Sequence, residues 1–367
     1  MLEKLIEMSN KYGQDPEYVL AGGGNTSYKD DTTLYVKGSG TALATITADG
    51  FVAMDRKKLS EIFEKEYPDD DQLREAAVLE DMLASRLPGN EHKRPSVEAA
   101  LHNLMDFSYI LHVHPALVNG ITCAKDGKKT ADALFGGEYI WIPLCKPGYT
   151  LAALCKQALE RFAQQHGQRC SVIILQNHGI FFGADGTEEM DRLVLRVMNA
   201  IKQKTKHEYD FSPAVYDAQK AGRAVEEIRC IGGDDAAYTE FICNGSVLKL
   251  VQDQRSFAPL AAPFSPDHIV YCKAKFLFAD CEHLKEDYAA FKKREGYAPR
   301  VIALAGLGVV IACGSEKDLQ NAQMLFFDAV KIAEYAQNFG GENPLPADFV
   351  DFIANWEVEA YRSKVAQ

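Results

Sequence analysis

The segment Ser108-Tyr-Ile-Leu-His-Val-His-Pro115 is an apolar run that predicts a buried strand. It carries His112 and His114 two positions apart. Because successive side chains of a strand alternate between its two faces, both imidazoles should point the same way, about 7 Å apart along the chain. Two imidazoles placed in this way can bind one metal ion.

A second apolar run, residues 171–176, ends at Asn177-His178-Gly179. A buried strand here would carry His178 to the edge of the same sheet. Three histidines at rigid strand ends, with a fourth coordination position left open, are typical of a catalytic zinc site rather than a structural one. Each histidine alone could be an ordinary hydrogen-bonded core residue. The two motifs together favour the metal site.

Two glycine-rich stretches lie upstream, Ala21-Gly-Gly-Gly-Asn-Thr-Ser27 and Gly38-Ser39-Gly40-Thr41. Glycine frees the backbone for unusual dihedral angles and lets N–H groups approach an anion closely. Either stretch could be a plain turn. Their closeness in the sequence favours an anion-binding role.

The segment Arg94-Pro-Ser-Val-Glu98 predicts the start of a helix, with Ser96 as its N-cap and Glu98 in the first turn. A carboxylate near a helix N-terminus is favourable for the helix dipole alone. The same arrangement would offer a phosphate both N–H groups and the Ser96 hydroxyl. Glu98 would then lie beside the metal. His102, one turn later, could form a hydrogen bond with Glu98, and we expect it to be a structural residue or to support the site from outside.

Composition bounds the class of protein. The 367 residues are 47% hydrophobic and 25% charged, as in an ordinary globular protein, and the net charge of −12 argues against nucleic acid as a partner. Nine scattered cysteines without a C-x-x-C pair predict reduced thiols. The acidic start of the chain does not predict a signal peptide, and no apolar run is long enough for a membrane span. We therefore expect a soluble cytoplasmic protein that binds neither membrane nor nucleic acid.

Strand and helix signals alternate along the chain and predict an α/β fold. We expect one domain over residues 1–210 and a second α/β region over residues 211–367. Helices are predicted over residues 2–12, 72–87, 151–166 and 187–206, and strands over residues 32–37, 108–115, 139–143, 172–175 and 180–182. An acidic helical tail is predicted over residues 348–364, with Phe349, Ile353 and Trp356 on its apolar side.

The second region carries a possible internal repeat. Residues 172–182 align with residues 301–311 at a constant offset of 129, and Leu307 stands where the first copy has His178. Asp267–Cys272 could be a further repeated strand. Any two buried strand–turn–helix units look somewhat alike, so the similarity could also be incidental. In both cases the second region lacks the histidines, and we expect it to support the first as a degenerate repeat without metal ligands.

The motifs together resemble the class II aldolase/adducin family over roughly residues 1–205. Those that carry the resemblance are Gly24-Asn-Thr-Ser27, Gly38-Ser-Gly40, Pro95-Ser-Val-Glu98, His112-Val-His114 and Asn177-His178. Finer similarities point to the aldolase portion of bifunctional rhamnulose-1-phosphate aldolase/lactaldehyde dehydrogenase proteins: Trp141-Ile-Pro, Pro147-Gly-Tyr, Ser265-Pro-Asp-His268 and the tail around Trp356. In those proteins a dehydrogenase domain follows. We expect dehydrogenase activity to be absent here or supplied elsewhere.

The resemblance implies a three-layer α/β/α class II aldolase-like fold with an additional C-terminal α/β region. It implies a zinc ion, or another divalent metal ion, held by His112, His114 and His178, with Glu98 as the catalytic acid/base. It also implies a symmetric homo-oligomer. The residues that it implies for the substrate's phosphate are Gly24, Asn25, Ser39, Gly40 and Ser96.

The implied activity is that of a metal-dependent lyase. It would cleave a ketose 1-phosphate such as rhamnulose 1-phosphate by a retro-aldol reaction, giving dihydroxyacetone phosphate and a small aldehyde. Aldolases of the family often have two serines before the glutamate, whereas this chain has Ser96 and Val97. The phosphate is therefore less firmly implied than the metal. The alternatives are a sugar-phosphate epimerase or dehydratase that uses the same kind of site, and a non-catalytic adducin-like binding module.

Overall fold

The computed structural model describes residues 1–354. Within them the chain forms two compact units. The first consists of Met1–Thr122 and Lys128–Lys204, and the second of Cys123–Gly127 and the described residues from Thr205 onward. The domain boundary expected after residue 210 lies close to this division.

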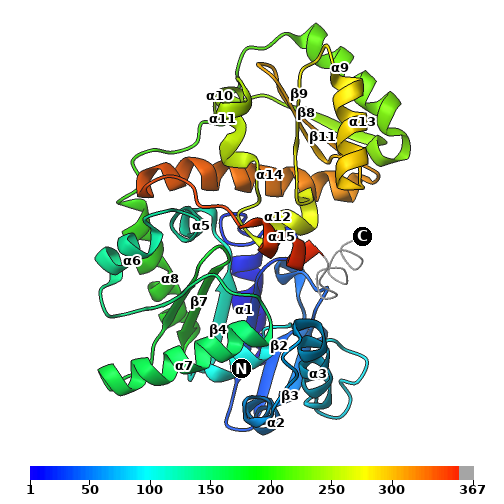
Figure 1. Ribbon diagram of the computed structural model, residues 1–367. Coiled ribbons are helices and arrows are strands. Elements are labelled where there is room, and N and C mark those ends of the chain that lie inside the picture. Colours follow the sequence, from blue (N-terminus) through cyan, green and yellow to red (C-terminus); the bar gives the residue numbers. More distant parts are fainter. Residues whose placement is uncertain (355–367) are drawn as a thin grey trace. The chain divides into compact units, whose positions relative to one another are not determined.

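Seven strands of the first unit form one mixed sheet in the order β3-β2-β1-β4-β7-β6-β5. Figure 1 labels four of them, which follow one another across the sheet as β7, β4, β2 and β3. Neighbouring strands are antiparallel except β5 and β6, which are parallel. The strands are β1 (Asn25–Lys29), β2 (Thr33–Lys37), β3 (Phe51–Asp55), β4 (Tyr109–Val113), β5 (Ile140–Ile142), β6 (Val172–Leu175) and β7 (Gly179–Ala184).

Helices cover both faces of this sheet, which confirms the expected three-layer α/β/α arrangement. Helices α4 and α7 pack on one face through Leu101, Leu151 and Phe162, whereas α1 and α8 contact the sheet at β1 and β7. The α-helices are α1 (Leu2–Gly13), α2 (Arg56–Glu61), α3 (Asp71–Ala84), α4 (Ala99–Leu104), α5 (Ala116–Thr122), α6 (Gly127–Phe135), α7 (Tyr149–His166) and α8 (Thr187–Lys202). Short 3₁₀ helices are η1 (Leu43–Thr45), η2 (Ala48–Gly50) and η3 (Ile62–Glu64).

The strand register brings distant residues onto one face. Asn25 of β1 pairs with His112 of β4, and His112 pairs on its other side with Phe181 of β7. Residues directly opposite in antiparallel strands point to the same face of a sheet. Since Phe181 packs in the cluster that contains residues of α4 and α7, Asn25 and His112 face these helices as well.

Four strands of the second unit form a smaller sheet in the order β8-β11-β10-β9. Its core joins α9 and α13 to the strands through residues such as Ile228, Phe291 and Ile302. The strands are β8 (Tyr238–Ile242), β9 (Leu277–Ala279), β10 (Val301–Leu304) and β11 (Gly308–Cys313). The helices are α9 (Ala218–Gly232), α10 (Gly245–Leu250), α11 (Gln254–Phe257), α12 (Pro266–Cys272), α13 (Leu284–Glu295), α14 (Glu316–Ala336) and α15 (Ala347–Ala354), with 3₁₀ helices η4 (Gly233–Ala236), η5 (Ala258–Leu260) and η6 (Gln337–Phe339).

Three strands of the second unit have the bounds of β4, β6 and β7 shifted by 129 residues; they are β8, β10 and β11. Their pairing is also the same. Strand β11 is antiparallel to both β8 and β10, as β7 is to β4 and β6, and β9 lies parallel to β10 as β5 does to β6. The offset that the sequence shows between residues 172–182 and 301–311 therefore extends to a third strand.

The turns of the two units share their hydrogen bonds as well. The Asn177 N–H donates to the Thr122 carbonyl at 3.2 Å, and the Gly306 N–H donates to the Val251 carbonyl at 2.7 Å. The offset between the donors and between the acceptors is again 129. The expectation of a strand over Asp267–Cys272 is wrong, because these residues form α12. Pro266 occupies the first turn of that helix, where its fixed φ favours helix formation.

The predicted tail is seen in part. Helix α15 buries Phe349 and Ile353, as its apolar pattern indicates. Trp356 and the remainder of the predicted tail helix lie outside the described residues. None of the helices in residues 1–354 is both long and apolar enough to cross a membrane.

Candidate metal centre

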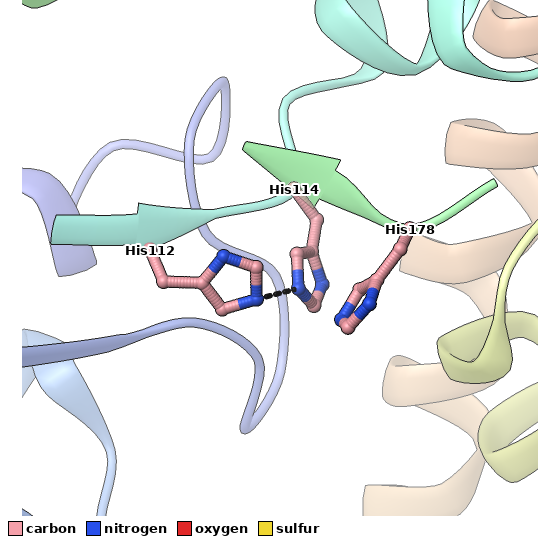
Figure 2. Close-up of side chains that lie close together, drawn as sticks. All are labelled: His112, His114 and His178. Atoms are coloured by element: carbon pink, nitrogen blue, oxygen red, sulfur yellow. Dashed lines mark hydrogen bonds between the residues drawn. The ribbon is translucent and has the colours of Figure 1, made fainter. Parts of the chain in front are cut away.

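Three imidazoles meet at the end of the sheet (Figure 2). His112 lies in β4, His114 directly follows that strand, and His178 lies in the turn between β6 and β7. One ring nitrogen from each lies within 4.8 Å of the others. The Nε2 atoms of His112 and His114 are 2.9 Å apart. The structure thus brings together all three histidines that the sequence singles out.

The turn before β7 is shaped to place His178. Asn177 adopts a left-handed conformation with φ of 54°, and the His178 N–H donates to the Leu175 carbonyl at 3.3 Å. A Cβ atom at Gly179 would lie 2.5 Å from the His114 ring and 2.6 Å from the Val113 carbonyl oxygen. Glycine is therefore required after His178, because β4 passes too close for any side chain.

Hydrogen bonding fixes the orientation of His112. Its Nδ1 lies 3.0 Å from the Ile180 carbonyl oxygen, to which it donates. The Phe181 ring stacks on the imidazole with centroids 3.9 Å apart. In neutral His112, Nε2 therefore carries the lone pair and faces the other two histidines. A ligand histidine that donates its second ring N–H to a carbonyl is a common feature of metal sites.

The Glu98 carboxylate completes this cluster. Its Oε1 atom lies 3.3 Å from His112 Nε2 and 3.6 Å from His178 Nε2. Oε1 is buried and has no hydrogen-bond partner among the described residues, whereas Oε2 accepts from Asn25 Nδ2 at 2.7 Å. A buried carboxylate oxygen beside imidazole lone pairs is unfavourable without a compensating cation. Three imidazole nitrogens and a carboxylate oxygen are ligands that suit a divalent ion such as zinc.

Ser96 differs from its expected role. Helix α4 begins at Ala99 with Glu98 in the N-cap position, so Ser96 is not the cap. The Ser96 N–H instead donates to the Lys37 carbonyl at 3.0 Å, and its hydroxyl accepts from the Glu98 N–H at 3.3 Å. Pairing with the end of β2 keeps Ser96 outside the helix, which starts later than the local pattern suggests.

The residues predicted to bind phosphate fall into two groups. Gly24, with φ of 66°, precedes Asn25, and a Cβ atom at Gly24 would lie 2.9 Å from the His112 carbonyl oxygen. In the second group, the Ser39 N–H donates to the Arg94 carbonyl at 2.7 Å, and Gly38 bridges to Pro95, so the loop containing Ser39 and Gly40 runs beside Ser96. The backbone N–H groups of both serines are engaged in this pairing. Of Ser39 and Ser96, only the hydroxyl groups could therefore donate to a bound anion.

The His102 ring does not form the hydrogen bond with the Glu98 side chain that its helical spacing suggested. Its ring is fully buried and lies between Asn25 Oδ1 and the Ser27 hydroxyl, which is 2.7 Å from Nδ1. Sequence reasoning assigned no separate role to Ser27. Asn25 and Ser27 are two positions apart in β1, so their side chains point to the same face of the sheet. Predicting a strand over these residues would have placed both beside each other.

A buried lysine lies at the other end of this helix. The Lys29 ammonium donates to the His102 carbonyl at 2.7 Å, near the C-terminal end of α4. Burial, followed by repulsion from the Arg56 guanidinium, lowers the pKa of Lys29 to about 7. Between about pH 7 and 10, Lys29 is therefore protonated in the unfolded chain and largely deprotonated in the folded chain.

Stability should rise with pH over this range because of Lys29, by at most about 1.4 kcal/mol per pH unit. Lys29→Met removes the amine and should flatten the increase. The check is the free energy of unfolding by urea at pH 7 and pH 9 for both proteins, with the exposed Lys57→Met as a control. If the free energy of unfolding changes equally between pH 7 and pH 9 in the native protein and in Lys29→Met, Lys29 is not the group responsible.

Comparison with known proteins places this site in a family. Residues 3–204, which contain every candidate site residue, match the family model described as Class II Aldolase and Adducin N-terminal domain. An uncharacterized oxidoreductase of Bacillus subtilis (strain 168), YuxG, is 23% identical over 415 residues. The alignment covers 100% of this chain and 58% of that protein, so the chain spans little more than half the length of this relative.

Solved structures with the same type of domain are also similar. The N-terminal class II aldolase domain of a conserved Thermoplasma acidophilum protein is 23% identical, with a TM-score of 0.46 over 55% of this chain and 92% of that one. An L-fuculose-1-phosphate aldolase from Thermus thermophilus is 15% identical, with a TM-score of 0.36 over 55% and 94%. By the match of residues 3–204, more than half of its length, the chain belongs to the class II aldolase/adducin family.

Proposed function

We propose that this protein is a metal-dependent lyase that cleaves a ketose 1-phosphate by a retro-aldol reaction. The products would be dihydroxyacetone phosphate and a small aldehyde, and rhamnulose 1-phosphate is the type of substrate we favour. The observation that carries the proposal is the Glu98 carboxylate, whose unpartnered Oε1 faces the Nε2 atoms of His112 and His178. Membership of the class II aldolase/adducin family supports it.

His112, His114 and His178 would hold the metal ion. When bound, the ion supplies positive charge that stabilises the negative charge developing on the substrate oxygens as the carbon–carbon bond breaks. In the cleavage direction a substrate hydroxyl gives up its proton as the carbon–carbon bond breaks. Glu98 Oε1, the carboxylate oxygen left free by Asn25, would return a proton to the carbon beside the carbonyl group. The imidazole of His112 is held by Ile180 and Phe181 and needs no reorientation.

We propose Gly24, Asn25, Ser39, Gly40 and Ser96 as the phosphate site. Two glycine loops and two serine hydroxyls beside the Glu98 segment support it. Val97 supplies no hydroxyl, so this site would have one donor fewer than aldolases with two serines. A symmetric homo-oligomer is part of the same proposal, and sedimentation of the metal-loaded protein tests it.

A coupled assay for dihydroxyacetone phosphate tests the activity directly. Rhamnulose 1-phosphate and fuculose 1-phosphate are offered separately, with and without a chelator. Release that the chelator abolishes supports a metal-dependent aldolase. No release by metal-loaded protein would favour an epimerase or dehydratase, which product analysis of the same mixtures detects, and failure to bind metal would favour a binding module. Parallel mixtures with NAD⁺ test for oxidation of the aldehyde product, since the longer Bacillus relative is named an oxidoreductase.

For the second unit we propose that it is a degenerate copy of the core of the first, within a domain spanning residues 211–367. The constant offset of three strands and the shared turn hydrogen bonds support this origin. The positions of the three imidazoles are taken by Phe241, Cys243 and Leu307. This unit would then have lost its metal ligands and serve as a supporting part of the protein.

Restoring histidines tests the repeat. The triple variant Phe241→His, Cys243→His and Leu307→His should bind a second equivalent of Co²⁺ per chain, because Phe241 pairs with Val310 as His112 pairs with Phe181. The measurement is Co²⁺ titration followed by absorption, with circular dichroism to confirm folding. A control carries Glu240→His in place of Phe241→His, which puts that imidazole on the opposite face of β8. A folded triple variant that binds one equivalent would count against the repeat.

A further inference from the structure

We infer that His102 is a positioning residue for Glu98 and acts through the side chain of Asn25. The inference deepens the proposed function and rests on the role that it gives to Glu98. Four side chains form a continuous series from Ser27 through His102 and Asn25 to Glu98. The series ends at Oε2, the carboxylate oxygen that does not face His112 and His178.

Chemistry fixes the direction of every hydrogen bond in this series. A carboxylate can only accept, so Asn25 presents its Nδ2 amide to Glu98 Oε2. Asn25 Oδ1 then faces His102, and His102 Nε2 must carry the proton that it donates. The other ring nitrogen, Nδ1, is left to accept from the Ser27 hydroxyl at 2.7 Å. One tautomer of His102 alone satisfies both neighbours.

The surroundings hold this tautomer in place. His102 is fully buried, and burial lowers its pKa well below the ordinary histidine value, so the ring is neutral. Its plane is set by an edge contact with Phe181, the same ring that stacks on His112. Its backbone is held in α4, where its N–H donates to the Glu98 carbonyl at 2.9 Å.

The consequence for Glu98 is a fixed carboxylate plane. Terminal torsions of glutamate side chains are broad, so nothing intrinsic to Glu98 would keep Oε1 directed at the imidazoles. The donor from Asn25 removes that freedom, and Asn25 is itself held because His102 occupies its oxygen. A purely structural histidine would need to fill space and satisfy its own nitrogens. His102 does this within a series whose end is the candidate acid/base.

Two variants separate positioning from packing. His102→Leu fills the space but donates nothing to Asn25, whereas His102→Gln keeps an N–H donor. With Co²⁺ bound, we expect the visible absorption spectrum of His102→Leu to differ from that of the native protein, because Glu98 Oε1 adjoins the histidines. The spectrum of His102→Gln should stay close to native. In the aldolase assay kcat should fall about 10- to 100-fold in His102→Leu, with KM nearly unchanged, and largely recover in His102→Gln.

Nitrogen-15 NMR of the native protein provides a test that needs no variant and no substrate. We expect His102 to be neutral at pH 7, with the proton on Nε2. Native spectra and native kcat in folded His102→Leu, equal impairment of both variants, or a proton on Nδ1 would each overturn the inference. If no sugar phosphate is cleaved, the proposed function fails, but the Co²⁺ spectra and the tautomer still decide the role of His102.

Discussion

Replacing His178 by alanine is expected to abolish metal binding while leaving the protein folded. The variant loses one of three imidazole ligands, so affinity should fall by more than the roughly 10- to 100-fold typical of outer-shell changes. The measurement is zinc affinity by competition with a chromophoric chelator, together with a thermal unfolding curve. His92→Ala, at an exposed histidine, is the control.

The reason for the intact fold lies in the turn itself. His178 is held by its backbone, which donates to the Leu175 carbonyl and accepts from Asn119 Nδ2 at 3.3 Å. In the second unit the Leu307 N–H makes the corresponding bond to the Leu304 carbonyl with no imidazole present. Full zinc occupancy in His178→Ala would remove this residue from the site.

Glu98→Gln should keep its metal and lose most of its activity. Glutamine is nearly isosteric, and its carbonyl oxygen can still accept from Asn25 Nδ2, so the local structure should persist. It cannot take up the proton, and kcat should fall by about 10²- to 10⁴-fold. The rate of dihydroxyacetone phosphate release checks this, with the exposed Glu80→Gln as a matched control. Turnover near the native rate would exclude Glu98 as the acid/base.

Much of the site could be predicted because its signals are local. The alternation of β4 places His112, and the apolar run before His178 predicts β6 without knowledge of any partner. The requirement for glycine at position 179 could not be predicted in this way. It arises from the approach of Val113 and His114, which no local pattern reveals.

The errors at Ser96 and His102 share one physical cause, which is pairing between distant segments. Serine is a favoured N-cap residue, but the Ser96 N–H donates to the Lys37 carbonyl of β2, and this keeps Ser96 outside the helix. His102 lies one helical turn from Glu98, yet its partners are on β1, because the register of β1 against β4 puts Asn25 opposite His112. Helical spacing predicts only contacts within the helix, and not a hydrogen bond to a strand that is distant in sequence.

The shared turn geometry of the two units bears on how a metal ion would enter and leave. The turn that carries Leu307 forms with Phe241, Cys243 and Leu307 in place of the three imidazoles. The equivalent turn around His178 should therefore not need a metal ion in order to fold. Zinc fingers, by contrast, unfold when their metal is removed. Here exchange of one ion for another would be a local event that leaves the fold intact. Which ion occupies the centre would then follow the supply around the protein rather than the moment of folding.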